Sequence, residues 1–478
     1  MDSQEESVKP TDNVDFFLLV EEKRIPVDRD ILVKSSNYFR AMFSSGMREN
    51  CQNVVELHGL SSASVRALVN LLQTSQLSLR DTDIEDFIAT ANFLQVQKAV
   101  DYVKSHLDAH ACVDVLNIAE LYCINDLEEA AYSFLVDNYF DIFRKGQYER
   151  LREEQQTRVR ELRKSIKSYI CAIVEYDEAS ADTPRKTRNL YYHDDKEDVF
   201  RPYKTVDSRV PKSSYGAAVL DNNLYIVGGY VDAGGSTGSA TGQAVGSGFR
   251  FDPMTRQWHE IKPLQQARAG FTLAATDTHL YAIGGKAEVD LFTVERYDPK
   301  DDTWTFVAPL PRPVKPEAAA ACMGDVYVAE SAARFMSPDR LLKYCTGQDE
   351  WTDLGKIPYR LQCDSDMVSF ADFVMVIGSH AIKSYNITSG EWYTMMRPMG
   401  GGYTKNRFDH VVYDGDIFFV GRVTTQRCTP SRGVWDCLAG VPGCGYRKAF
   451  VLKLKRLLPF PDEVYSGGNA GIRKAMNT

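Results

Sequence analysis

The second half of the chain repeats one hydrophobic pattern. Short apolar runs end in paired glycines in DNNLYIVGG, which begins at Asp221, and in THLYAIGG, which ends at Gly285. Related two-run patterns follow in AAAACMGDVYVAES, MVSFADFVMVIGS and DHVVYDGDIFFVGR. Short apolar runs separated by turn residues predict antiparallel strand pairs. We expect the paired glycines to adopt backbone conformations that side chains would prevent, although they could also simply mark hairpin turns.

Five tryptophans, all in this half, set the period of the repeat. They are separated by 46, 47, 41 and 43 residues, at Trp258, Trp304, Trp351, Trp392 and Trp435. An aromatic residue stands seven positions before four of them, at Phe251, Tyr297, Tyr344 and Tyr385. Turn residues fill each gap, so each unit adds a second hairpin to the first. Four short strands per repeat of about 45 residues are typical of a propeller blade.

The ends of this region complete the count of blades. Cys428 stands where the fifth hairpin should have its aromatic residue. The run VFRPYK from Val199 lies where a tryptophan strand belongs, and AFVLKLKRLL from Ala449 can join it in one sheet. We therefore expect an all-β propeller over residues 190–458 with six blades, followed by a flexible tail, 459–478.

The first half has the pattern of a compact α/β unit from Asp15 onward, after a disordered start at residues 1–14. The runs FFLLV and RIPV predict a hairpin, and Ile84, Phe87, Ile88, Ala91 and Leu94 fall on one face of a predicted helix. Further on, Val159, Leu162, Ile166, Tyr169, Ile170 and Ile173 also share a helical face. This pattern predicts helical structure through residue 178, and the polar stretch 179–189 is typical of a linker.

Composition and charge exclude several classes of function. The net charge of −9 is unfavourable for binding nucleic acid, and no apolar run is long enough to span a membrane. The N-terminus has no signal-peptide pattern, and ten scattered cysteines are typical of reduced thiols, so we expect a cytoplasmic or nuclear protein. The eight histidines form no metal-ligand spacing, and no catalytic motif appears. We expect no cofactor, no metal and no enzymatic activity.

Both halves resemble one known family. The glycine pairs with their aromatic and tryptophan register resemble kelch repeats. The segments DFFLLVEEKRIPVDRDILVKSSNYFRAMFSSGMRE, VVELHGLSS and NFLQVQKAVDYVKSHL resemble a BTB/POZ domain, here residues 15–108, and CVDVLNIAELYCINDLEEAAYSFL resembles the start of a BACK domain, here a shortened region 109–178. The chain is thus similar to BTB-kelch (kelch-like) proteins, a multidomain family in which the BTB domain binds cullin-3 and the propeller holds a protein substrate for ubiquitin transfer.

The resemblance assigns the cullin contact to Met47, Glu49 and Phe43. In cullin-binding members an apolar residue and a glutamate two positions later occupy the loop after the YFRAMF helix, and Met47 and Glu49 match them. A flexible thioether suits an irregular apolar pocket. The alternative is that Met47 packs internally and Glu49 is solvated. The hairpin of helices from Cys112 to Phe143 would extend the same surface.

A substrate would contact loops at one rim of the propeller. The candidate residues lie shortly before the first strand of a blade: Lys212, Tyr215, Arg268, Phe271, Arg360, Arg407 and Phe408. Guanidinium groups from several blades could hold an acidic or phosphorylated degron. The alternatives are that the cations bind backbone carbonyls in the channel and that the aromatics belong to the core.

Two departures from the family pattern matter for function. The 14 residues before Asp15 lack the apolar helix that members exchange between subunits, so we expect a homodimer to be weak. The region between the BTB domain and the propeller is short, which alters the reach between cullin and substrate. A scaffold that binds actin or transcription complexes without a ligase role is the alternative function.

Overall fold

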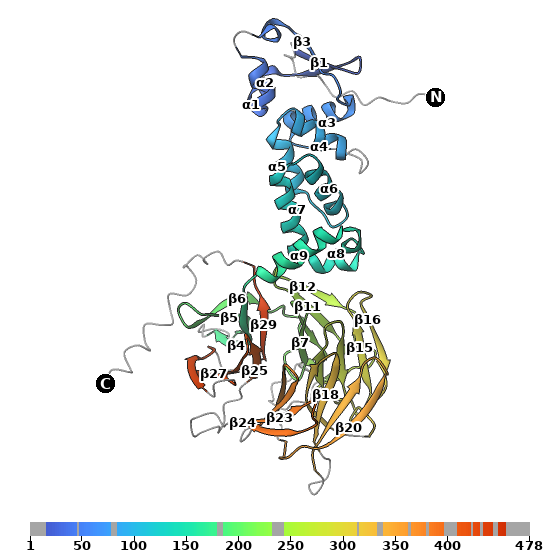
Figure 1. Ribbon diagram of the computed structural model, residues 1–478, viewed down its shortest axis with the longest axis vertical. Coiled ribbons are helices and arrows are strands. Elements are labelled where there is room, and N and C mark those ends of the chain that lie inside the picture. The colour runs from blue at the N-terminus through green and yellow to red at the C-terminus, as the bar shows by residue number, and fades with distance from the viewer. Residues whose placement is uncertain are drawn as a thin grey trace, which may run out of the picture. The chain divides into compact units, whose positions relative to one another are not determined.

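The computed structural model places the chain in two compact units that divide after Lys164 (Figure 1). It describes residues 16–44, 47–77, 84–178, 185–231, 243–312, 315–331, 338–361, 365–378, 382–395, 409–421, 424–430, 434–442 and 448–455. Within these ranges no helix is both long and apolar enough to cross a membrane.

The first unit begins with a three-stranded sheet in the order β2-β1-β3. Strand β1 (Phe16–Val20) pairs antiparallel with β2 (Lys23–Val27) and parallel with β3 (Val54–Glu56). Glu21 and Glu22 both have positive φ, 49° and 64°, as the tight hairpin turn requires. The predicted hairpin is therefore confirmed.

Helices make up the rest of the first unit. They are α1 (Arg29–Ser35), α2 (Asn37–Met42), η1 (Arg48–Cys51), α3 (Ser62–Thr74), α4 (Ile84–Phe93), α5 (Gln97–Ser105), α6 (Cys112–Leu121), α7 (Asn125–Asp137), α8 (Tyr139–Arg144), η3 (Tyr148–Arg150) and α9 (Glu153–Ser165). The predicted helix is α4, and it buries Phe87, Ile88 and Ala91. One cluster of buried side chains extends from Phe16 in β1 to Leu127 in α7, so the sheet and these helices share a core.

The second unit consists of four-stranded antiparallel sheets, and the described residues form six of them. We number the sheets in the order of their first strands. Sheet 1 comprises β7 (Gly216–Leu220), β8 (Asn223–Val227), β11 (Gly248–Asp252) and β12 (Gln257–Ile261). Sheet 2 comprises β13 (Thr272–Ala275), β14 (Leu280–Ile283), β15 (Val294–Asp298) and β16 (Thr303–Val307). Sheet 3 comprises β17 (Lys315–Cys322), β18 (Asp325–Ser331), β19 (Arg340–Cys345) and β20 (Glu350–Lys356).

The remaining sheets follow the same plan. Sheet 4 comprises β21 (Asp366–Phe370), β22 (Phe373–Ile377), β23 (Ile382–Asn386) and β24 (Trp392–Met395). Sheet 5 comprises β25 (Asp409–Tyr413), β26 (Asp416–Val420), β27 (Thr424–Thr429) and β28 (Val434–Ala439). Sheet 6 comprises β29 (Lys448–Lys453), β4 (Ser168–Glu178), β5 (Arg185–Asp194) and β6 (Val199–Thr205). A two-stranded ribbon of β9 (Tyr230–Val231) and β10 (Gln243–Ala244) is attached to sheet 1 through its connecting chain.

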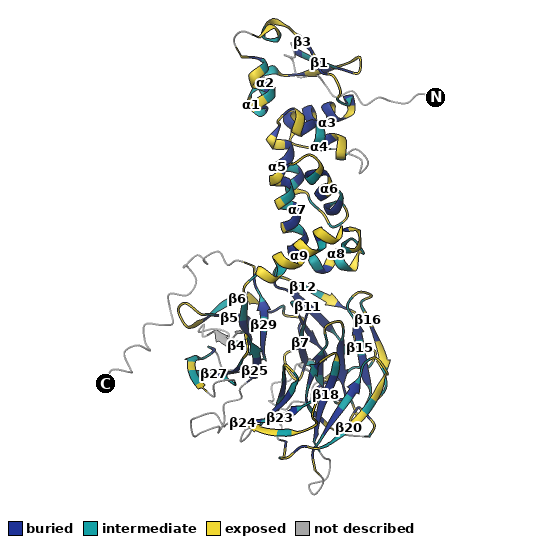
Figure 2. Cartoon of the chain, in the orientation of Figure 1, coloured by how far each residue is buried: buried dark blue, intermediate teal, exposed yellow. Residues whose placement is uncertain are grey.

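The first strands of successive sheets contact one another in a ring. Strand β7 contacts β13, and the contacts continue through β17, β21, β25 and β29 back to β7. Figure 2 shows buried residues along β18 and exposed residues along the outer strand β20, in agreement with their burial patterns. Radially arranged sheets with buried inner strands and exposed outer strands are the architecture of a β-propeller.

Sheet 6 corrects the predicted boundary between the helical region and the propeller. Helix α9 ends at Ser165, and the following segment is strand β4, which pairs with both β29 and β5. All residues from Ile170 to Val174 are buried. A strand that is buried on both faces has a continuous apolar run without alternation, and such a run can be mistaken for a helical face. The predicted helical region to residue 178 was therefore wrong.

The predicted linker 179–189 is also partly a strand. Residues 185–189 belong to β5, whereas 179–184 lie outside the described residues. Two other expectations for this sheet are confirmed, because VFRPYK forms the outer strand β6 and the C-terminal run forms β29. The sheet thus joins the end of the propeller to its beginning.

The seven-residue aromatic register is a cross-strand pair. Phe251, Tyr297, Tyr344 and Tyr385 lie directly opposite the tryptophan that follows each of them, with ring centroids 5.0 to 5.1 Å apart. Such aromatic pairs stabilise adjacent strands. Cys428 pairs with Trp435 in sheet 5, where Phe419 contacts the indole instead at 5.2 Å.

In sheets 2 and 3 an aspartate of the same hairpin accepts a hydrogen bond from the tyrosine of this register. The Asp349 Oδ1 atom accepts hydrogen bonds from the Tyr344 hydroxyl at 2.6 Å and from the Ala308 N–H at 2.8 Å. The Trp351 indole donates to the Ala308 carbonyl at 2.8 Å, so one hairpin of sheet 3 holds the chain that leaves sheet 2. Asp302 makes the equivalent bonds one sheet earlier.

We expect Asp349→Gly to lower the free energy of unfolding by about 1 kcal/mol, because the two hydrogen bonds are lost from an exposed carboxylate. Glycine keeps the positive φ of 55° at this position, and Gly390 occupies the equivalent place in sheet 4. The hydrogen bond from Tyr344 is the main reason that the pKa of Asp349 lies below its usual range. A lowered folded-state pKa stabilises the fold above the usual aspartate pKa of about 4, and this stabilisation is lost as the pH falls below it.

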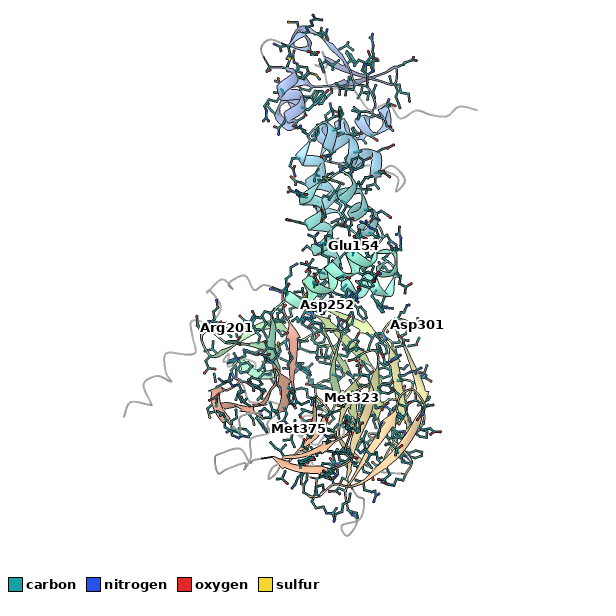
Figure 3. The ribbon with its side chains drawn as sticks, in the orientation of Figure 1. Glu154, Arg201, Asp252, Asp301, Met323 and Met375 are labelled. Carbon is teal, nitrogen blue, oxygen red and sulfur yellow. The ribbon has the colours of Figure 1, made fainter. Side chains whose placement is uncertain are left out.

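The difference in the free energy of unfolding between the wild-type protein and Asp349→Gly should therefore be smaller at acidic pH. Urea unfolding of both at pH 7 and at pH 3 measures it. Asp301→Ala, which removes an exposed aspartate from the hairpin of sheet 2 (Figure 3), is the control and should cost less. An equal penalty at both pH values would contradict a role for the ionised carboxylate.

The glycine pairs have the conformations that the sequence pattern predicts. Gly228 and Gly229 have φ of 60° and 106°, and Gly284 and Gly285 have φ of 61° and 95°. A Cβ atom on Gly228 would lie 2.6 Å from the Arg268 backbone oxygen, on the loop that leads into the next sheet. The glycines therefore serve close packing between neighbouring sheets and do more than mark a turn.

Candidate functional site

The loop after α2 presents the methionine and glutamate that the sequence selects. Met47 precedes η1, and 53% of its surface is exposed, which excludes the alternative that it packs internally. Glu49 lies in the first turn of η1 and is partly exposed. Within the described part of the chain, its carboxylate has no hydrogen-bond or ion-pair partner. The two side chains are thus available on the surface of the first unit.

Phe43 lies beneath this loop. It is 9% exposed and packs against Phe16 at 5.3 Å and Phe39 at 5.9 Å between ring centroids. It therefore belongs to the core and does not form exposed surface for a cullin contact.

A polar groove lies among α6, α7 and α9. It has a volume of about 630 Å³ and is lined by Asn117, Glu120, Leu121, Tyr132, Arg152, Glu154, Gln155 and Arg158. At its centre the Glu120 carboxylate accepts hydrogen bonds from Arg152, from Tyr132 at 3.0 Å and from the buried Gln155 at 2.9 Å. Glu154 lies on α9 (Figure 3). Leu121, 66% exposed, adds an apolar element at the end of α6.

The charged side chains of this groove are largely paired within the protein. Arg158 pairs with Glu128 at 2.7 Å, and its guanidinium lies 4.3 Å from the ring centroid of Tyr132. Burial, the hydrogen bond to Glu120 and its negative charge raise the pKa of Tyr132 to about 12. These residues hold the helices together, and Leu121 stays exposed at the end of α6.

The rim of the propeller does not present Arg268. This side chain is fully buried, and its Nη2 atom lies 2.5 Å from the Glu295 carboxylate. Its Nη1 atom donates to the carbonyls of Gly284 and Thr293, both at 2.9 Å. The expectation that Arg268 binds a substrate is contradicted, and the alternative that it binds backbone carbonyls is the correct one.

The other rim residues differ in exposure. Lys212 is exposed, and Arg360 is 48% exposed at its side chain but pairs with Asp339 at 3.1 Å. Tyr215 and Phe271 are both 8% exposed and belong to hydrophobic clusters between sheets, so they are core residues and not contacts for a peptide. Arg407 and Phe408 lie outside the described residues. A ring of free guanidinium groups is therefore not present in the described part of the rim.

A charged cluster that the sequence did not predict joins sheets 4, 5 and 6. His410 Nδ1 lies 3.0 Å from Asp366, and Lys448 Nζ lies 3.3 Å from Asp409. Although burial opposes it, the charge of Lys448 and the hydrogen bond from His410 lower the pKa of Asp366. Burial raises the pKa of Asp409.

The cluster has the ligand types of a metal site. The ligand atoms of Asp366, Asp409 and His410 lie within 4.8 Å of one another. However, the Lys448 ammonium already pairs with the Asp409 carboxylate, and the Ala449 N–H donates a hydrogen bond to the same carboxylate. Asp366 lies 43 positions before the adjacent pair Asp409 and His410, and Lys448 lies 39 positions after Asp409, so no sequence spacing could reveal the cluster. We interpret the cluster as an ion-pair network between sheets.

Comparisons with known proteins agree with both units. The family model "BTB/POZ domain" matches residues 4–111, and the model "Kelch motif" matches residues 211–265 and 267–311. The chain therefore combines a BTB/POZ domain with kelch motifs, as BTB-kelch proteins do. The match covers neither α6 nor α7, α8 and α9, so the assignment of these helices to a shortened BACK region stays a prediction.

Relatives of this chain have kelch in their names, and the name of one of them also contains BTB. The chain is 28% identical over 450 residues to "Kelch repeat and BTB domain-containing protein 13" from Homo sapiens, covering 91% of this chain and 94% of the relative. It is 24% identical over 526 residues to "Kelch-like protein 36" from Mus musculus, covering 88% and 84%. BTB and kelch domains are protein-interaction modules, so an adaptor or scaffold role follows for the chain.

Proposed function

We propose that this chain is a substrate-recognition adaptor of a cullin-3 RING ubiquitin ligase. In this function the BTB domain binds cullin-3, the propeller binds a protein substrate, and the chain itself carries out no chemistry. The observation that carries the proposal is the exposed Met47, two residues before Glu49 on η1 of a BTB domain, where the Glu49 carboxylate has no partner among the described residues.

The physical chemistry of this surface suits a docking contact. The Met47 thioether is exposed, so it does not contribute to the packed core. It can instead fill an irregular apolar pocket of a partner. The carboxylate beside it can orient the partner through a charge-assisted hydrogen bond. Leu121 and Tyr122, 66% and 37% exposed at the end of α6, add apolar surface to the same unit.

Replacing Met47 by aspartate should weaken the binding of the cullin-3 N-terminal domain to the full-length chain at least about tenfold, which corresponds to about 1.4 kcal/mol. Glu49→Lys should act in the same direction, because the carboxylate is lost and its charge is reversed. Isothermal titration calorimetry with the purified proteins measures both affinities.

Met323→Asp is the matched control. Met323 is 73% exposed at the turn between β17 and β18 of the propeller (Figure 3), and aspartate tolerates its positive φ of 49°. It should leave cullin-3 binding unchanged. A wild-type chain that does not bind cullin-3 would instead favour the scaffold function, in which the propeller binds cytoskeletal or transcription-complex proteins without a ligase role.

The substrate class is less constrained than the cullin contact. An acidic or phosphorylated degron could not be bound by Arg268, which is neutralised by Glu295, and Arg360 already pairs with Asp339. A homodimer and a cytoplasmic or nuclear location remain predictions.

A further inference from the structure

The short helix that carries Glu49 is held by few contacts of its own. No residue of η1 is buried, and no side chain caps its N-terminus. Its local backbone hydrogen bonds are long, 3.3 Å from Asn50 N to Met47 O and 3.2 Å from Gln52 N to Glu49 O. A 3₁₀ turn with such bonds and without buried side chains is weakly stable by itself. Another group must fix its position.

Arg29 at the start of α1 supplies that group. Its Nη2 atom donates to the Asn50 backbone oxygen at 2.9 Å and to the Asn50 side-chain oxygen at 2.5 Å. Both bonds are charge-assisted, which makes them stronger than bonds between neutral groups. They tie the middle of η1 to a helix that is distant in sequence.

Both the guanidinium of Arg29 and the backbone from which it extends are held in place. Its Cζ atom lies 4.3 Å from the centroid of the Phe43 ring, and that ring is fixed in the core by Phe16 and Phe39. The Asp28 carboxylate caps α1 by accepting from the Asp30 N–H at 2.8 Å, which fixes the backbone from which Arg29 extends. A planar cation is well suited to stacking on a ring while its edge donates hydrogen bonds.

We infer that Arg29 is a positioning residue for the partner-binding surface: it holds η1 so that Met47 and Glu49 are presented together. The inference rests on the proposed function of these two residues. Without Arg29 the turn would sample other conformations, and a partner would bind only the fraction of molecules with the correct one. If that fraction falls to about a tenth, the apparent dissociation constant rises about tenfold.

Arg29→Ala in the full-length chain should therefore weaken binding of the cullin-3 N-terminal domain about tenfold. Amide hydrogen exchange of residues 48–52 should become faster in the same variant. Arg29→Lys should recover part of both effects, since an ammonium can donate to Asn50 but cannot stack as a flat group on Phe43.

Arg40→Ala is the matched control. Arg40 also makes three side-chain hydrogen bonds in this region, to Val33 O, Asn37 Oδ1 and Lys34 O, but none reaches η1. It should change neither cullin-3 binding nor exchange at residues 48–52. Thermal unfolding of both variants separates these local effects from a general loss of stability.

A double-mutant cycle tests whether Arg29 acts through Asn50. Asn50→Ala removes one of the two acceptors, so it should weaken binding less than Arg29→Ala, and the double variant should equal Arg29→Ala alone. Additive effects would overturn the inference, and so would unchanged exchange at residues 48–52 in Arg29→Ala. A wild-type chain without affinity for cullin-3 would overturn the proposed function, whereas the exchange measurement would still decide whether Arg29 holds η1.

Discussion

Replacing Glu295 by alanine is expected to lower the free energy of unfolding by about 3 to 5 kcal/mol, because it leaves the fully buried charge of Arg268 without its counter-ion. Neither side chain of this pair has any solvent exposure. The Glu295 carboxylate also accepts from the Gln265 and Gln266 N–H groups at 2.7 and 3.2 Å, and these donors lose their acceptor. The pair lies between sheets 1 and 2, so its loss should destabilise the propeller.

Urea unfolding followed by tryptophan fluorescence measures this effect, since all five tryptophans lie in the propeller sequence. Glu260→Ala is the matched control. It breaks the ion pair with Arg209, in which the two side chains are 60% and 56% exposed, and such surface pairs contribute little to stability. Equal losses for Glu295→Ala and Glu260→Ala would contradict the buried-charge explanation.

A double substitution separates the buried charge from the lost packing. Arg268→Met combined with Glu295→Leu replaces the ions by apolar side chains of similar length, and such replacements are often close to neutral. The double variant should therefore be more stable than Glu295→Ala alone. A double variant that is less stable than Glu295→Ala would show that the guanidinium bonds to the Gly284 and Thr293 carbonyls dominate the stability of this site.

Replacing Gly229 by alanine is expected to cost about 2 to 5 kcal/mol, from backbone strain and steric overlap together. Its φ of 106° is outside the region that residues with a Cβ atom normally occupy. The new Cβ would also lie 2.6 Å from the Ser213 backbone oxygen and 3.1 Å from Tyr215 Cα. Backbone atoms cannot move aside as the end of a flexible side chain can.

Gly324→Ala is the control for this variant. Gly324 has a similar φ of 83°, but no atom lies within 4 Å of its added Cβ, so only the strain should remain, about 1 kcal/mol. Chemical denaturation of the two variants compares them. Equal losses would show that the close approach of the loop before β7 does not constrain Gly229.

The architecture of the propeller followed from local patterns. The aromatic and tryptophan positions are cross-strand partners in one hairpin, and the glycine pairs end a strand where the backbone takes a positive φ. Both depend on residues that are close in sequence, so their spacing survives as a visible period. The same argument explains why Met47 could be selected, because a loop after a recognisable helix can be located from its neighbours.

The sequence pattern did not predict that β4 is a strand. Its residues from Ile170 to Val174 are apolar without interruption, and a strand covered on both sides has no alternation to distinguish it from a buried helix. It is a strand because it pairs with β5 on one side and on the other with β29, more than 270 residues later in the chain.

The domain order, the repeat and the loop that presents Met47 and Glu49 could all be predicted from patterns along the chain. Which charges are available could not, because it depends on partners that other strands supply in the folded protein. Arg268 precedes the first strand of sheet 2 and Glu295 lies on its third, so they meet only when the sheet forms. In the same way, Arg29 reaches Asn50 only after α1 and η1 pack together. A residue type shows what a side chain can bind, and the folded neighbourhood determines whether that capacity is already used.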